Sequence, residues 1–172
     1  MTTQQLYLIS CLYLVALILV AFFTRATARR IAGALAGAAA FGVMALGADA
    51  LGEQLGWWRM ALWGSNILPL VCLGFIVSGT PVYLVTWRVA RKFGWRGLAV
   101  VVVVLTVIGP PRDYALMARF PAWGSYAPGV APVLAIAAIY AILVPVGHSV
   151  MRLVAGPATA DRLARRPRAR VD

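Results

Sequence analysis

Five long apolar segments dominate this chain of 172 residues. They cover residues 4–23, 31–51, 65–88, 97–120 and 129–153, and a helix needs about 20 apolar residues to cross a bilayer. Inside a bilayer the backbone can satisfy its hydrogen bonds only in helices or in a closed barrel, and these segments lack the alternating pattern of barrel strands. With 62% hydrophobic and 12% charged residues, the chain falls outside the range of soluble domains. The sequence therefore predicts an all-α integral membrane protein, a bundle of five transmembrane helices.

The basic residues are divided very unevenly between the polar segments that separate these spans. Thirteen of the sixteen Lys and Arg residues fall in the first gap, in the third gap and at or after the end of the fifth span. The second and fourth gaps together carry three basic and three acidic residues and are neutral. Because Lys and Arg mark cytoplasmic segments, we expect the N-terminus outside and a basic cytoplasmic tail over residues 155–172. Membrane insertion accounts for the basic charge, so no nucleic-acid partner is expected.

Glycine and proline mark particular positions within the spans. Gly33 and Gly37 have the small-xxx-small spacing that lets two helix backbones approach closely, which predicts that the second span lies at the centre of the bundle. Pro81 removes a backbone hydrogen bond inside the third span. The hydroxyls of Ser78 and Thr80 are expected to satisfy the carbonyl groups that this proline leaves free.

A Pro-Pro pair at residues 110–111 is predicted to break the fourth span. The part of the helix before the pair rises only about 18 Å, which is short of the roughly 30 Å of a bilayer core. The pair and the charges that follow it are therefore expected below the outer membrane surface. Two alternatives stay open for residues 110–127, a kinked helix that completes the crossing or a re-entrant turn. Residues 121–128 are expected to form a surface loop or interfacial turn.

The charged residues of the neutral face gather near the ends of the second and fourth spans. Asp49 and Glu53 lie one helical turn apart, and Asp113 follows the Pro-Pro pair. Charged groups inside a membrane usually pair or line a polar cavity. The three carboxylates are candidate catalytic residues that could protonate or deprotonate a lipid-soluble substrate, and the alternative is an ion-paired lock between the two spans. The candidate binding residues are Arg112, Tyr114, Trp57, Trp58 and Arg59.

The remaining reactive residue types do not form a recognisable site. Cys11 and Cys72 fall inside spans, where packing explains them, and His148 has no partners at its depth for a triad or a metal site. The chain contains no phosphate loop, dinucleotide glycine motif or zinc-protease motif. We therefore expect neither a cofactor nor a metal.

Two strings in the chain carry a resemblance to known proteins. GPPRDY at residues 109–114 and PVYLVTWRVARKFGWRG at residues 81–97 resemble a family of small uncharacterised bacterial inner-membrane proteins. The resemblance covers most of the chain and implies a multi-pass location in the bacterial inner membrane without implying an activity. The acidic, glycine-containing and aromatic stretch after the second span also looks loosely like the carotenoid hydratases and cyclases, which act on polyenes. The Pro-x-Glu-Glu/Asp pattern of the heterodimeric lycopene cyclases does not occur in the chain.

These features lead to two hypotheses about function. The first is a non-enzymatic component of the inner membrane that binds a lipid or a partner protein through a polar pocket in the outer leaflet. The alternative is a membrane enzyme that acts on an isoprenoid, carotenoid or lipid substrate by carboxylate acid-base chemistry.

Overall fold

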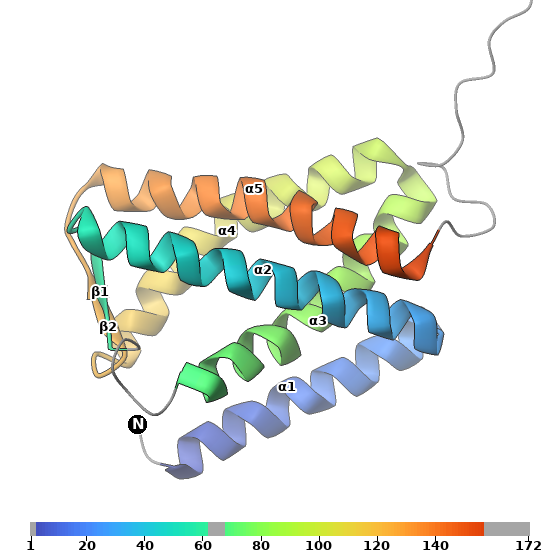
Figure 1. Cartoon of the computed structure of the whole chain (residues 1–172), viewed down its shortest axis with the longest axis horizontal. Coiled ribbons are helices and arrows are strands. Elements are labelled where there is room, and N and C mark those ends of the chain that lie inside the picture. The colour runs from blue at the N-terminus through green and yellow to red at the C-terminus, as the bar shows by residue number, and fades with distance from the viewer. Residues whose placement is uncertain (1–2, 62–67, 157–172) are drawn as a thin grey trace, which may run out of the picture.

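The computed structural model describes residues 3–61 and 68–156, and in these ranges the chain forms five helices and one two-stranded sheet (Figure 1). Successive helices run in opposite directions along the bundle. The helices are α1 (Thr3–Thr24), α2 (Ala28–Gln54), α3 (Leu68–Phe93), α4 (Trp95–Arg119) and α5 (Val130–Ala155), and the strands are β1 (Trp58–Met60) and β2 (Gly124–Tyr126).

Four of the helices are long and apolar enough to cross a membrane, namely α2, residues 72–93 of α3, α4 and α5. In α1 the described apolar stretch, Cys11–Thr24, is shorter than these four helices. The prediction of a helical multi-pass protein is therefore confirmed, whereas a fifth crossing and the orientation stay predictions. Residues 65–67 of the predicted third span and residues 157–172 of the predicted tail lie outside the described residues.

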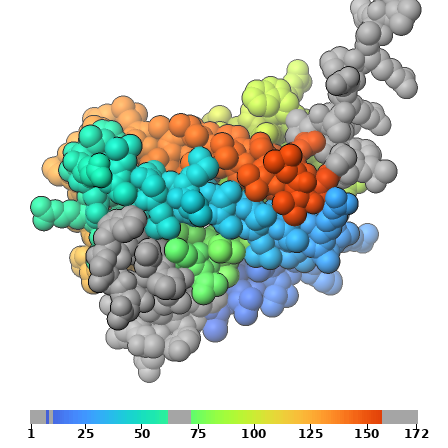
Figure 2. All heavy atoms as spheres, viewed as in Figure 1, coloured from blue at the N-terminus to red at the C-terminus, as the bar shows by residue number. Residues whose placement is uncertain are grey.

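Helix α2 packs most extensively against α5 and then against α3, while α3 contacts all four other helices. The central place predicted for α2 is therefore shared with α3. Figure 2 shows α2 and α5 lying side by side along one face. A Cβ atom at Gly33 would lie 2.8 Å from the carbonyl oxygen of Met151, and one at Gly37 would lie 2.5 Å from that of Gly147. The two backbones approach this closely because both α2 positions lack a side chain, which confirms the predicted role of the pair.

Helix α4 continues through Pro110 and Pro111 and ends at Arg119. Of the two alternatives for residues 110–127, the helix that continues past the prolines is therefore confirmed as far as Arg119 and the re-entrant turn is wrong, while the predicted interruption of the helix at the Pro-Pro pair does not occur. Each proline removes an amide donor, but its fixed φ angle is compatible with a helix and the turns on both sides keep their hydrogen bonds. Gly109 and Pro110 are buried against the neighbouring helix, which holds this turn in place.

The hydroxyls near Pro81 bond to other carbonyl groups than the one that this proline leaves free. Ser78 donates to the carbonyl of Gly74 at 2.7 Å, and Thr80 donates to the carbonyl of Ile76 at 2.6 Å. The carbonyl freed by Pro81 belongs to the residue four positions before it, which neither hydroxyl contacts. The predicted compensation is wrong because each hydroxyl bonds one turn back along its own helix.

The two strands close the end of the bundle at which α2 ends and α5 begins (Figure 1). They pair antiparallel, with Trp58 opposite Tyr126, Arg59 opposite Ser125 and Met60 opposite Gly124. The segment 121–128, predicted as a loop or turn, therefore contains a strand. We call this end of the bundle the strand end. The opposite end, at which α1, α3 and α5 terminate, is called the basic end.

Candidate functional site

Three side chains at the strand end form a closed set of hydrogen bonds. Nε and Nη2 of Arg112 donate to Oδ1 of Asp113 at 2.9 and 2.6 Å. The Tyr140 hydroxyl donates to Oδ2 of Asp113 at 2.9 Å and accepts a hydrogen bond from Nη2 of Arg112 at 2.6 Å. This triad ties α4, which carries the ion pair, to α5, which carries the phenol. The predicted pairing of α4 with α2 through an ion pair is therefore replaced by a link to α5.

The two charged members of the triad differ in their exposure. The side chain of Asp113 is 17% exposed, whereas that of Arg112 is 56% exposed. Gly109 makes the arrangement possible, because a Cβ atom there would overlap the ring of Tyr140. Phe41 of α2 covers the same ring, with 6.3 Å between the centroids. The triad thus shields its carboxylate, while one edge of its guanidinium, which includes Nη1, takes no part in the hydrogen bonds of the triad.

The end of α2 holds β1 through two hydrogen bonds. Oε1 of Glu53 accepts a hydrogen bond from the backbone amide of Met60 at 2.5 Å, and the indole of Trp58 donates to the backbone carbonyl of Asp49 at 3.0 Å. The indole also lies directly over Gly52, where a Cβ atom would overlap it. Glu53 is therefore engaged in holding the strand.

The carboxylate of Asp49 differs from the other two. Within the described residues it accepts no hydrogen bond, although its backbone carbonyl does. It is half-buried and close enough to Asp113 and Glu53 to interact electrostatically with both. Asp49 is thus the carboxylate of the cluster that remains available for a ligand or a proton.

Aromatic rings cover the cluster on the side of the strands. Tyr126 stacks on Tyr114 with 4.5 Å between the ring centroids and meets Trp58 edge-on at 5.9 Å. Burial raises the pKa of the Tyr126 phenol, and the negative charges of Asp113 and Asp49 raise it further. Because this shift favours the neutral form, the phenol stays protonated beside the carboxylates.

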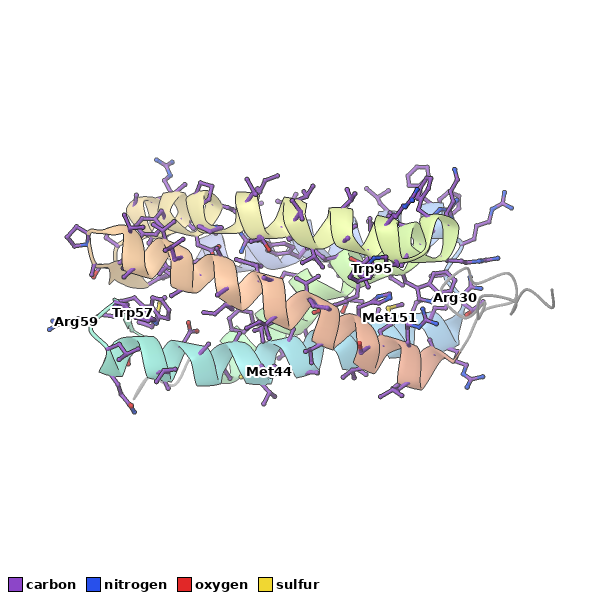
Figure 3. All side chains as sticks on the ribbon, turned by 90° about the horizontal axis from the view of Figure 1, so that it is seen from above. Arg30, Met44, Trp57, Arg59, Trp95 and Met151 are labelled. Atoms are coloured by element: carbon purple, nitrogen blue, oxygen red, sulfur yellow. The ribbon has the colours of Figure 1, made fainter. Side chains whose placement is uncertain are left out.

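Most of the residues predicted for the site meet at the strand end, and Figure 3 shows Trp57 and Arg59 there. Trp57 adjoins Trp58, with 6.1 Å between the centroids, while Arg59 is exposed on β1. Tyr126 and Tyr140 were not among the predicted site residues. The one feature of the sequence that could have indicated Tyr140 is a phenol in an otherwise apolar span.

The other candidate groups lie apart from this cluster. Cys11 and Cys72 are free thiols, the first exposed and the second partly buried. His148 is buried in α5, toward the basic end. Within residues 3–61 and 68–156, no group of three or more His, Cys, Asp or Glu residues is arranged to hold a metal ion.

No protein-family model, curated protein or solved structure matches the chain. The two family resemblances therefore stay predictions.

Proposed function

We propose that the protein is a non-enzymatic component of the bacterial inner membrane that binds a lipid at the strand end. In this proposal five helices cross the membrane, the strand end faces outward and the basic end faces the cytoplasm. The charge distribution supports that orientation, because eight of the eleven described Lys and Arg residues belong to the basic end. All three described acidic residues belong to the strand end.

The half-exposed guanidinium of Arg112 is the observation that carries the proposal. Asp113 and Tyr140 hold one edge of the guanidinium and so fix its direction. Arg112 precedes the end of α4 by two turns, which corresponds to about 10 Å along the helix and to the boundary between acyl chains and headgroups. A fixed, exposed guanidinium at this depth is suited to a lipid phosphate.

The hydrogen bonds of the carboxylates favour a binding role over catalysis. Glu53 accepts the amide of Met60, and Asp113 is bound by both of its triad partners. A carboxylate held in this way stabilises the fold, and freeing it for proton transfer would break those contacts. Glu53 and Asp113, two of the three predicted catalytic carboxylates, therefore have a structural role.

A membrane enzyme is the second candidate, and the carboxylate of Asp49 favours it. This group is half-buried, has no hydrogen-bond partner within the described residues and lies near the protonated phenol of Tyr126. In such an enzyme Asp49 would exchange a proton with an isoprenoid, carotenoid or lipid substrate, a general acid-base role.

Mass spectrometry of the lipids that copurify with the protein in a mild detergent tests both candidates. We expect Arg112→Gln to lower the bound phospholipid at least fivefold while the protein stays folded, because Tyr140 still binds Asp113. Arg119→Gln, on the same helix and exposed, is the matched control and should retain the lipid.

Three other results would contradict lipid binding at Arg112. Loss of a copurifying isoprenoid or pigment in Asp49→Asn, with folding intact, would favour the enzyme. An equal loss of folded protein in the alanine variants of Asp49, Arg112 and Asp113 would reduce the cluster to a structural lock. A stoichiometric protein in place of the lipid would identify a partner protein as the ligand.

A further inference from the structure

Two arginines from different helices meet on one tryptophan ring at the basic end. Cζ of Arg30, on α2, lies 4.2 Å from the ring centroid of Trp87, and Cζ of Arg91, on α3, lies 5.5 Å from it. Trp87 is 5% exposed and belongs to the buried core. Because the core holds the ring of Trp87 in place, the ring in turn positions the guanidiniums of Arg30 and Arg91. Figure 3 shows Arg30 at the end opposite Arg59.

Other arginines of the basic end bind neutral acceptors. Nε of Arg29 donates to the backbone carbonyl of Val154 at 3.3 Å, and Nη1 of Arg88 donates to that of Thr24 at 3.0 Å. These contacts complete the last turns of α5 and α1, whose free carbonyls attract cations. Arg29 and Arg88 are thus explained by helix capping.

Within the part of the chain that the structure describes, neither capping nor an ion pair accounts for Arg30 and Arg91. The three acidic residues of the described chain all lie at the strand end, and neither guanidinium forms a salt bridge within residues 3–61 and 68–156. Two cations on one ring repel each other, and a cation–π contact at a partly exposed site offsets only about 0.5–1 kcal/mol. Sorting of basic residues to the cytoplasmic face requires charge near the span ends but does not require two helices to bring their charges together.

We propose that Arg30 and Arg91 form a binding site for a phosphate group. An anion between the two guanidiniums removes their repulsion, and phosphate oxygens match the planar donor fork of arginine. Both side chains are half-buried, so the site is accessible from the surface and partly shielded from water. The phosphate belongs either to the headgroup of an anionic lipid or to a small soluble phosphate compound. This site is separate from the one proposed at the strand end.

Titration of the full chain in neutral detergent micelles tests the proposal. The two probes are a short-chain phosphatidylglycerol and inorganic phosphate, and isothermal titration calorimetry measures their affinity. In the Arg112→Gln background, which lacks the lipid site proposed at the strand end, we expect saturable binding at one site per chain. Tighter binding of the lipid by at least tenfold identifies a headgroup site, whereas similar affinities identify a site for phosphate itself, and both results support the proposal.

Variants that conserve the charge distinguish a defined phosphate site from nonspecific attraction of anions to a basic surface. Arg30→Lys and Arg91→Lys keep the charge and the topology signal but lose the planar fork, so each should weaken binding about tenfold. Arg96→Lys is the matched control, since Arg96 is exposed at the start of α4, and its affinity should stay within twofold of the parent.

Two outcomes would overturn the phosphate site. One is the absence of saturable binding to either probe. The other is an equal effect of all three lysine variants, which is the behaviour of a diffuse positive surface. Circular dichroism and size-exclusion chromatography monitor folding, and Arg91→Lys alone decides the question if Arg30→Lys does not fold.

Discussion

The two ends of the bundle neutralise their charges in different ways. At the strand end Asp113 lies inside a hydrogen-bonded triad, and the described residues there include three acidic and three basic ones. At the basic end the described residues include eight basic and no acidic ones. Among the described residues, the strand end can therefore pair its charges with one another, whereas the basic end holds no acidic partner and can take its counter-charges from lipid headgroups or from solution.

The ends also differ in what holds their helices together. Polar side chains bridge the strand end, where α4 meets α5 and α2 meets β1. Toward the basic end, α2 and α5 meet backbone to backbone at Gly33 and Gly37. Close contact between two helix backbones tolerates no added volume, whereas a polar bridge can lose one member and still be partly solvated. The basic half should thus be the more sensitive to a small substitution.

The largest effect is expected for Gly37→Ala. The new Cβ atom would lie 2.5 Å from the carbonyl oxygen of Gly147, and backbone cannot move aside as a flexible side chain can. We expect a loss of about 3 kcal/mol in the free energy of unfolding. Gly47→Ala, on the same helix with open space around it, is the control and should be neutral or slightly stabilising. Thermal unfolding in detergent measures both, and equal melting temperatures would refute close packing as the support of this half.

The second effect concerns the triad and is tested by a double-mutant cycle. Arg112→Met leaves the mostly buried Asp113 with Tyr140 as its partner, and because Arg112 is half-exposed we expect a loss of about 2 kcal/mol. Adding Asp113→Leu removes the stranded charge and should restore at least half of that loss. Purely additive losses in the cycle would show that the ion pair does not support the strand end.

The sequence predicts the bundle well because long apolar segments leave few alternatives in a membrane. Gly33 and Gly37 could also be assigned to a helix contact, since their spacing alone selects one face. The strands were missed because each has three residues and depends on tertiary contacts, such as the hydrogen bond between Glu53 and Met60. The continuity of α4 likewise depends on burial of Gly109 against α5, which no local pattern reveals.

The sequence could predict at which end of the bundle the residues of the candidate site lie. It could not predict which side chains bond to one another there. Asp49 and Asp113 reach the same end because both follow the apolar part of a span. That Tyr140 joins Asp113 depends on the rotation of α5 about its axis, which an almost uniformly apolar sequence leaves undetermined. The same holds for Arg30 and Arg91, whose meeting on one ring requires α2 and α3 to be neighbours.

A third, smaller effect is expected for Gly52→Ala at the strand end. Its Cβ atom would overlap the indole of Trp58, which must then turn away and lose its hydrogen bond to the carbonyl of Asp49. Because a side chain can move where backbone cannot, we expect about 1 kcal/mol of destabilisation and a red-shifted tryptophan emission. The Gly47→Ala variant again serves as the control. An emission spectrum identical to that of the parent protein would mean that the indole does not depend on Gly52.

The smallest effect is expected at the capping arginines of the basic end. Arg88→Gln removes the guanidinium that donates to the carbonyl of Thr24 and should cost about 0.5 kcal/mol, because that carbonyl ends α1 near water. Arg96→Gln removes the same charge without a described contact and should leave the melting temperature unchanged. If the two variants were equally destabilised, the net charge of this end would contribute to stability and the hydrogen bond of Arg88 would not. If Arg88→Gln alone lost stability, part of the stability of the basic end would come from the capping of α1, and Arg30 and Arg91 would remain the candidates for binding an anion.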